Sequence, residues 1–183
     1  LENEERWEEV ADKVIHIGKK LAKAKCEAIM LCSNTIHKVA SRVQEKIGIP
    51  IINVIDETAR IIKEKGIQEV GLLGTRFTME GRFYVERLRD KHDLDPLIPE
   101  EGERTFIHDI IYNQLAKGIF LDETKRRILE IIDSLTEEGA SGVILGCTEL
   151  PLLIHQEDVN VPLFNTLKIH LSSAIDFSLS NSQ

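Results

Sequence analysis

The stretch "GVILGCTELP", residues 142–151, runs from apolar residues directly into Cys147 and Thr148. This pattern places the cysteine where a buried strand ends and a helical turn begins. Unpaired backbone N–H groups at such a turn stabilise a thiolate, lower the thiol pKa from about 8.5, and also bind carboxylates. We therefore expect Cys147 to be a reactive group beside an anion-binding turn. The alternative is a small buried residue that only packs, because free cysteine is among the most buried residue types.

A second stretch, "AIMLCSNTIH", residues 28–37, has nearly the same form and leads into Ser33, Asn34 and Thr35. The Asn34 amide and the Thr35 hydroxyl can hold a small carboxylate, as the Thr148 hydroxyl can at the other stretch. Two such sites facing one cleft suit proton exchange on both faces of one carbon, where one group removes a proton and the other returns one. The two stretches together favour racemisation or epimerisation.

Other chemistries have less support in the sequence. "GCTEL" lacks the second glycine of a nucleophile elbow, and "GLLGT" does not match the dinucleotide-binding G-x-G-x-x-G pattern. Cys32, His37, Cys147 and His170 do not have the spacing of zinc ligands, and no lysine stands in a recognisable Schiff-base context. We predict that the protein needs no metal ion and no cofactor.

Alternating helix and strand patterns must position these residues. Apolar residues spaced by three and four predict a helix from Trp7 to Leu21, and further helices are expected at about 103–115 and 122–138. Short apolar runs predict strands at "EAIMLC", "PIINV", "EVGLLG", "GVILG" and "VPLFN", with a weaker edge strand at "LDPLIP". The alternation predicts an α/β fold with mostly parallel sheets flanked by helices.

A short repeat divides the chain into two parts. "PIIN" at Pro50 and "PLFN" at Pro162 share one frame, and each follows one of the two polar stretches. We interpret this as two pseudosymmetric lobes with the active site in the cleft between them, since ligands of parallel sheets collect at the carboxyl ends of the strands. The first lobe is expected to comprise residues 1–66 plus 162–183, and the second residues 67–161.

The composition of the sequence indicates which classes of binding partner and which cellular compartment to expect. A net charge of −8 on 183 residues argues against a nucleic-acid-binding face. No apolar run approaches the roughly 18 residues of a membrane span, so we expect no membrane partner. The three cysteines are odd in number and lack metal-type spacing, which favours a reducing cytoplasm over a disulfide scaffold.

At these residues the sequence resembles the aspartate/glutamate racemase family, which works without pyridoxal phosphate. "GCTELP" is similar to the second-cysteine motif of that family, and "SNTIH" to its first motif, C-N-T-x-H. "VGLLGTRFTM", residues 70–79, resembles the strand and threonine-rich turn that open the second lobe. The resemblance implies two α/β lobes, a homodimer, and an acidic amino acid, aspartate or glutamate, bound between the lobes.

The resemblance also assigns roles to single residues. It makes Cys147 one acid/base and gives the substrate groups to Asn34, Thr35, Thr75, Thr78 and Thr148. The first catalytic cysteine of the family falls on Ser33, so Cys32 is expected to pack rather than react. A branch of the family that favours L-aspartate and L-glutamate also carries a hydroxyl residue there, so we expect the L form to be the better substrate.

The sequence departs from the family pattern at two further places, and alternative functions are also considered. Asn165 stands where such relatives tend to have aspartate, and the resemblance assigns no role to it or to His170. The first strand and glycine-rich turn of the family have no counterpart, so we expect residues 1–183 alone to be less stable, prone to associate and weakly active. Alternatives are an isomerase or decarboxylase of another small diacid, or a non-catalytic relative that binds acidic amino acids or serves as a dimer scaffold.

Overall fold

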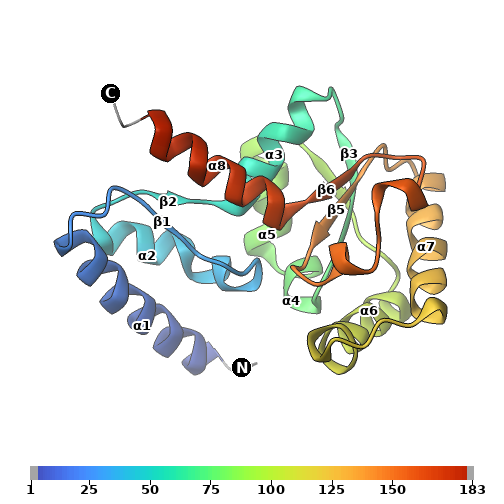
Figure 1. The fold of residues 1–183 in the computed structure, drawn as a ribbon, viewed down its shortest axis with the longest axis horizontal. Helices are drawn as coiled ribbons and strands as arrows, with labels where there is room; N and C mark the ends of the chain where they lie inside the picture. Colours follow the sequence, from blue (N-terminus) through green and yellow to red (C-terminus); the bar gives the residue numbers. More distant parts are fainter. Residues whose placement is uncertain (1–3, 181–183) are drawn as a thin grey trace.

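Two parallel sheets organise residues 4–180, the part of the chain that the computed structural model describes (Figure 1). The smaller sheet pairs β1 (Ile29–Met30) with β2 (Ile51–Ile52). The larger sheet has the order β4-β3-β5-β6, with strands β3 (Glu69–Gly74), β4 (Asp95–Leu97), β5 (Val143–Gly146) and β6 (Leu163–Asn165). All pairings among the described strands are parallel, so the predicted α/β class is confirmed, and the proline-containing β4 is an edge strand as expected.

A small lobe, residues 4–52, forms around the two-stranded sheet. Its helices are α1 (Glu4–Lys23) and α2 (Ala40–Ile47), and the short helix η1 (Thr35–Val39) precedes α2. The two helices close a small apolar core in which Ala11 of α1 and Val43 of α2 are almost fully buried. Gly48, whose φ of 77° favours glycine, ends α2 before the next strand.

A large lobe, residues 54–180, forms around the four-stranded sheet. Its longer helices are α3 (Val54–Glu64), α6 (Glu101–Asn113), α7 (Asp122–Glu137) and α8 (Thr166–Ser180). Short helical turns connect them: α4 (Arg76–Met79), α5 (Arg82–Glu86), the π-helix η2 (Arg87–Lys91), η3 (Leu115–Lys117), η4 (Leu150–Leu152) and η5 (Gln156–Asp158). Fully buried residues of β3, α6 and α7, such as Leu72, Ile107 and Ile128, share one core. The predicted helices near 103–115 and 122–138 are confirmed.

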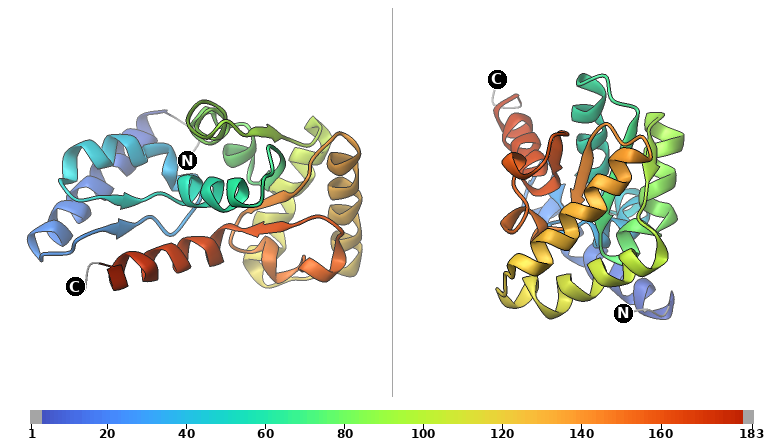
Figure 2. Two further views of the ribbon diagram at one scale, coloured as in Figure 1. Left: turned by 90° about the horizontal axis from the view of Figure 1, so that it is seen from above. Right: turned by 90° about the vertical axis from the view of Figure 1, so that its right-hand side faces the viewer.

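The lobe boundary differs from the expected one. Leu163 and Phe164 of β6 pair in register with Val143 and Ile144 of β5, so this strand belongs to the large sheet and not to the first lobe. Burial of Phe164 in the large core, at 2% exposure, explains the pairing. From β6, α8 extends back along α3 toward the small sheet, which Figure 2 shows from above. Residues 1–3 and 181–183 of the expected first lobe lie outside the described residues.

The repeat noted at Pro50 and Pro162 has a structural meaning. Each copy is a short strand that ends in an asparagine at the start of a helix. Asn53 accepts hydrogen bonds from the backbone N–H groups of the first turn of α3, and Asn165 accepts one from Lys168 of α8 at 3.0 Å. Asparagine is favoured at this position because its side-chain oxygen satisfies an N–H group that has no partner within the helix. Asn165 therefore starts α8.

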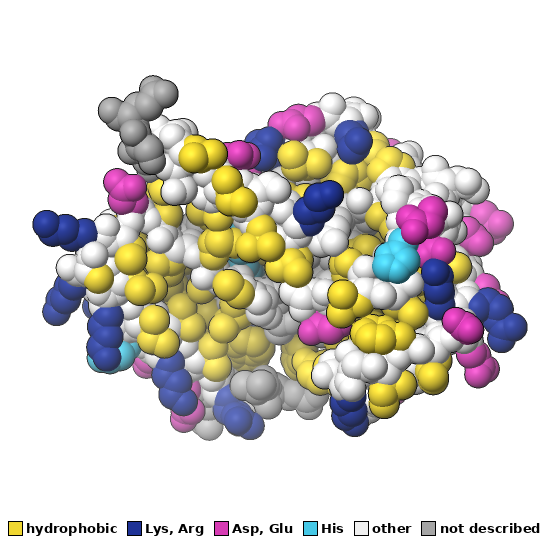
Figure 3. All heavy atoms as spheres, viewed as in Figure 1, with side chains coloured by type: hydrophobic (Ala, Val, Ile, Leu, Met, Phe, Trp, Pro, Cys, Tyr) yellow, Lys and Arg dark blue, Asp and Glu magenta, His cyan; other side chains and the backbone are white. Residues whose placement is uncertain are grey.

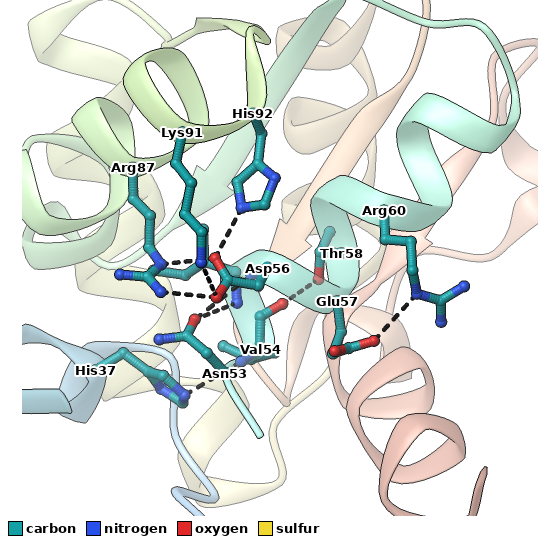
Figure 4. A network of polar contacts seen from close by, with 11 residues as sticks. His37, Asn53, Val54, Asp56, Glu57, Thr58, Arg60, Arg87, Lys91 and His92 are labelled. Atoms are coloured by element: carbon teal, nitrogen blue, oxygen red, sulfur yellow. Dashed lines mark hydrogen bonds and ion pairs between the residues drawn. The ribbon is translucent and has the colours of Figure 1, made fainter. Parts of the chain in front are cut away.

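An ion-pair cluster joins α3 to η2 within the large lobe (Figure 4). Asp56 accepts two hydrogen bonds from Arg87, both at 2.7 Å, one from Lys91 at 2.8 Å and one from His92 at 2.7 Å. Burial alone would raise the pKa of Asp56, but these donors outweigh it and hold the pKa well below its usual range. The cluster fixes the turn that follows α5 against the first turn of α3.

Apolar side chains are exposed along α8. Leu167, Leu171, Ile175 and Leu179 recur every four residues and are between 39% and 68% exposed. Figure 3 shows apolar side chains gathered over this side of the molecule, from α8 toward α1. Among the described residues, none of the helices has the length and apolar character needed to cross a membrane.

Candidate active site

A cavity of about 480 Å³ lies between the two lobes, at the carboxyl ends of β3 and β5. Both polar stretches line it: residues 32–36 after β1 on one side, and residues 146–149 at the end of β5 on the other. Thr75, at the end of β3, completes the polar part. The rest of the wall is mostly apolar and is formed by Trp7, Val10, Ile111, Tyr112 and Ala116. A neighbouring cavity of about 510 Å³ is lined by Arg76, Phe77, His108 and others, and includes none of the residues of either stretch.

Cys147 and Thr148 both donate hydrogen bonds to Glu149 in this cavity wall. The Cys147 Sγ donates a hydrogen bond to Glu149 Oε2 at 2.8 Å, and Thr148 Oγ1 donates to the same oxygen at 2.7 Å. Burial alone would raise the pKa of Glu149, but these two donors outweigh it and lower the pKa. Glu149 is therefore an ionised carboxylate that accepts a hydrogen bond from the thiol of Cys147.

The predicted low pKa of Cys147 is wrong for this arrangement. Burial raises the pKa of the thiol to about 12, and the hydrogen bond to the Glu149 carboxylate adds to the shift. The backbone N–H groups of Glu149 and Leu150 do favour the thiolate, as the sequence suggested, but they are outweighed. Only η4, a single 3₁₀ turn, follows the strand, so no long helix supplies a dipole to the thiolate.

Ser33 faces the same cavity from the small lobe, and His37 holds its backbone. His37 Nε2 accepts a hydrogen bond from the Val54 N–H at 3.2 Å, so the ring proton is on Nδ1, which donates to the Ser33 carbonyl at 2.8 Å. Burial lowers the pKa of His37 to about 4, which keeps the ring neutral at neutral pH. His37 thus ties the turn that carries Ser33 to the start of α3.

Cys32 does not pack in the core as expected. It is exposed and lines the cavity beside Ser33. Side chains of neighbouring residues face opposite sides only within a strand, and β1 ends at Met30. Beyond the strand the pleat no longer alternates the side chains, and Ser33 N–H donates to the Leu31 carbonyl at 2.7 Å in a tight turn.

Three of the threonines predicted to bind substrate are linked to one another. Thr35 Oγ1 lies 3.2 Å from Thr75 Oγ1 across the two lobes, and Thr75 Oγ1 lies 3.3 Å from Thr78 Oγ1. Thr35 and Thr75 line the cavity, as Thr148 does. Thr78 is fully buried and does not line it. Thr78 instead contacts Thr75, which caps α4 by accepting a hydrogen bond from the Thr78 N–H.

Asn34 lies between groups that the sequence did not single out. Its Nδ2 donates to Thr166 Oγ1 at 3.0 Å, and its Oδ1 accepts from the Tyr84 hydroxyl at 3.2 Å. Thr166 and Tyr84 are 132 and 50 residues away in the chain, so no local pattern marks them. Glu149, by contrast, is part of the quoted motif, and only its role was missed.

His170 connects α8 to the small lobe. Its Nε2 contacts the Ile52 carbonyl at 2.6 Å, which joins α8 to β2, and its ring packs edge-on against His37 with 5.7 Å between the centroids. Within residues 4–180, no group of three or more His, Cys, Asp or Glu side chains is placed to hold a metal ion.

Comparison with known proteins assigns the chain to a family. The sequence profile of the Asp/Glu/hydantoin racemases matches residues 1–174. The chain belongs to this family. Its fold superposes on a proposed Asp/Glu racemase from Yersinia pestis with a TM-score of 0.92 and 38% identity, covering 95% of this chain and 76% of the other. An aspartate racemase homologue from Pyrococcus horikoshii OT3 gives a TM-score of 0.85 and 37% identity, covering 96% and 77% of the two chains.

Among curated sequences, the glutamate racemase of Carnobacterium sp. (strain St2) is 27% identical over 126 residues. The match covers 68% of this chain but only 45% of that racemase, so the chain spans about half the length of this curated relative. The superpositions on the two solved structures show that the two-lobed α/β architecture is the fold of the family.

Proposed function

We propose that the protein is a cofactor-independent racemase of aspartate, glutamate or both, in which Cys147 and Ser33 exchange the α-proton. The observation that carries the proposal is that one cavity receives both motifs, Cys147 from the large lobe and Ser33 from the small lobe. A racemase needs two proton-transfer groups on opposite sides of one carbon, and a cavity between two strand ends provides them.

The hydrogen bond between Cys147 and Glu149 gives the first step. Glu149 takes the thiol proton, the thiolate removes the α-proton of the substrate, and the electron pair stays on the α-carbon next to the carboxylate. The Ser33 hydroxyl delivers a proton to the opposite face, and the resulting alkoxide recovers a proton from water. The hydroxide formed in this way takes the proton from Glu149, which restores the carboxylate and leaves Cys147 as a thiol. The reverse direction would need Ser33 as the base, which is a much weaker base than a thiolate at neutral pH. One enantiomer, by family resemblance the L form, is therefore the better substrate.

The described residues around the cavity also suggest how the substrate is held. Glu149 is the single charged side chain among those that line it, and before it takes the thiol proton it attracts the substrate ammonium group. The hydroxyls of Thr35, Thr75 and Thr148, with the Asn34 amide, are neutral donors for the substrate carboxylates. Thr78 supports Thr75 from behind and does not contact substrate in this proposal.

Assembly and location complete the proposal. A homodimer is supported by the exposed apolar side chains along α8, which a second copy would bury. A cytoplasmic location is supported by three free cysteines, because free thiols persist in reducing compartments. Sedimentation would report the dimer directly.

The proposal is tested by the optical rotation of L-aspartate and L-glutamate solutions over time. Loss of rotation with no loss of amino acid is expected. Loss of amino acid with release of carbon dioxide would indicate a decarboxylase instead. Heat of binding without any change in rotation would indicate a non-catalytic binding protein, and either result would contradict the proposal.

A further inference from the structure

A chain of hydrogen bonds, which we call the Asn34 chain, connects the two lobes behind the cavity. It runs from the Tyr84 hydroxyl to Asn34 Oδ1 at 3.2 Å, from Asn34 Nδ2 to Thr166 Oγ1 at 3.0 Å, and from Thr166 Oγ1 to the Leu145 carbonyl at 2.8 Å. The four residues come from α5, the turn before η1, the first position of α8, and β5. Tyr84 and Thr166 are fully buried, and Asn34 is 6% exposed.

The direction of each bond in the Asn34 chain is fixed. The Thr166 hydroxyl has one hydrogen, which it donates to the Leu145 carbonyl, so it must accept from the Asn34 amide nitrogen. The amide oxygen then faces Tyr84, whose pKa is raised by burial so that the phenol stays protonated and donates. The orientation of the Asn34 amide, including its second N–H, is therefore set by groups that do not line the cavity beside Cys147 and Ser33.

Two members of the Asn34 chain, Asn34 and Leu145, are close in sequence to the two proposed proton-transfer groups. Asn34 follows Ser33 directly, and Leu145 precedes Cys147 by two residues on β5. We propose that Thr166 and Tyr84 are positioning residues for racemisation, which fix the Asn34 amide and the separation of Ser33 from Cys147. This inference rests on the proposed function. Its physical basis is that proton transfer depends steeply on geometry, so that a displacement of about 1 Å costs on the order of 100-fold in rate.

If these bonds had only a structural role, removing one of them would change the kinetics no more than removing a similar bond elsewhere in the protein. Thr58 provides such a bond as a matched control. Thr58 is also fully buried, and its hydroxyl also donates to a backbone carbonyl, that of Val54, at 2.7 Å (Figure 4). Thr58 does not line the cavity and has no bond to Asn34. Thr58→Val and Thr166→Val therefore remove the same kind of bond, and only the second breaks the Asn34 chain.

The experiment compares the melting temperature, kcat and KM of Thr166→Val, Thr166→Ser, Tyr84→Phe and Thr58→Val, each assayed well below its own melting temperature. We expect Thr166→Val to lower kcat at least tenfold, Tyr84→Phe to lower kcat/KM at least threefold, and Thr58→Val to change neither by more than twofold. Thr166→Ser, which keeps the hydroxyl, should restore most of the rate. Equal kinetics in Thr166→Val and Thr58→Val would overturn the inference.

A second measurement separates this inference from the proposed function. Alkylation of Cys147 by iodoacetamide, followed residue by residue with mass spectrometry, reports the surroundings of the thiol whether or not the protein racemises amino acids. We expect Thr166→Val and Tyr84→Phe to change the alkylation rate of Cys147 at least twofold, and Thr58→Val to leave it unchanged. An inactive wild-type protein would refute the proposed function alone, whereas unchanged alkylation in Thr166→Val would refute the coupling of the Asn34 chain to Cys147.

Discussion

The thiol of Cys147 donates its hydrogen bond to the carboxylate of Glu149, 2.8 Å away and two residues along the same turn. Without substrate, Cys147 is a protonated thiol, because burial and the Glu149 carboxylate both raise its pKa. It also provides an acceptor for that proton when the substrate arrives. Glu149 is thus the residue that opposes the thiolate at rest and produces it in the proposed reaction.

Replacing Glu149 with glutamine should separate these two effects. Glu149→Gln removes the negative charge beside the thiol, so the pKa of Cys147 falls and its alkylation at pH 8 becomes faster than in the wild type. Racemisation should nevertheless slow, by about 10²-fold, because a general base is lost. The two rates are measured on the same samples. A variant that alkylates faster and also racemises faster would show that Glu149 only suppresses the thiolate.

Ser33 should determine which enantiomer is turned over faster. We expect the wild type to process the L form at least tenfold faster than the D form, because a hydroxyl is a poor base for the return direction. Ser33→Cys should raise turnover of the D form, and Ser33→Ala should abolish racemisation while leaving Cys147 reactive. Cys32→Ser is the neighbouring control and should retain most activity. Equal wild-type rates for D and L would remove Ser33 from the opposing position.

His37 should make the folded protein sensitive to mild acid. Its pKa is about 4 in the folded protein against an ordinary value of 6.5, so below pH 6.5 the unfolded chain takes up a proton that the folded protein does not. The stability that depends on neutral His37 is fully present above pH 6.5. It is lost as the pH falls toward 4, and the free energy of unfolding decreases by up to about 1.4 kcal/mol per pH unit. His170, Asp56 and Arg87 act on the same ring, and His170 contributes a smaller effect of the same sign.

His37→Gln tests this assignment, since glutamine can donate to Ser33 and accept from Val54 without titrating. Urea unfolding at pH 7 and pH 5 should show a smaller pH dependence in the variant than in the wild type. An identical dependence in both proteins would mean that another group is responsible.

The Asp56 cluster should contribute measurably to stability. Asp56→Asn leaves the partly buried Arg87 without its carboxylate, and we expect the free energy of unfolding to fall by about 2 kcal/mol. Asp95 is the matched control, because its contact with Arg89 is exposed on both sides. Asp95→Asn should cost about 0.5 kcal/mol or less. Similar losses in the two variants, measured by urea unfolding, would show that the cluster is only a surface feature.

Local patterns were sufficient for the parts of the fold that depend on local physics. The alternation of apolar runs and amphipathic helices predicted the α/β class, the edge position of β4 and the approximate positions of α6 and α7. The two polar stretches could be placed at one cavity because ligands collect at the carboxyl ends of parallel strands, and the ends of β1 and β5, which belong to different sheets, face the same cavity. The sheet to which 163–165 belongs could not, since it depends on how Phe164 packs in three dimensions.

The electrostatic state of the candidate site was not predictable in the same way. The motif named Cys147 and contained Glu149, yet whether the carboxylate turns toward the thiol depends on the backbone of a turn that has no regular pattern. Tyr84 and Thr166 reach Asn34 from distant segments, so their roles emerge only when the chain is folded. Cys32 was misplaced because β1 ends two residues earlier than its apolar run.

Exchange of the α-proton with solvent deuterium tests the central claim most directly, because it follows one proton-transfer event without requiring a full turnover. L-aspartate and L-glutamate are incubated in D₂O with the wild type, Cys147→Ser and Cys26→Ser, and the α-proton signal is followed by NMR. The account predicts loss of the signal with the wild type and with Cys26→Ser, and no loss above background with Cys147→Ser. Exchange in Cys147→Ser at the wild-type rate, or its absence in the wild type, would contradict it.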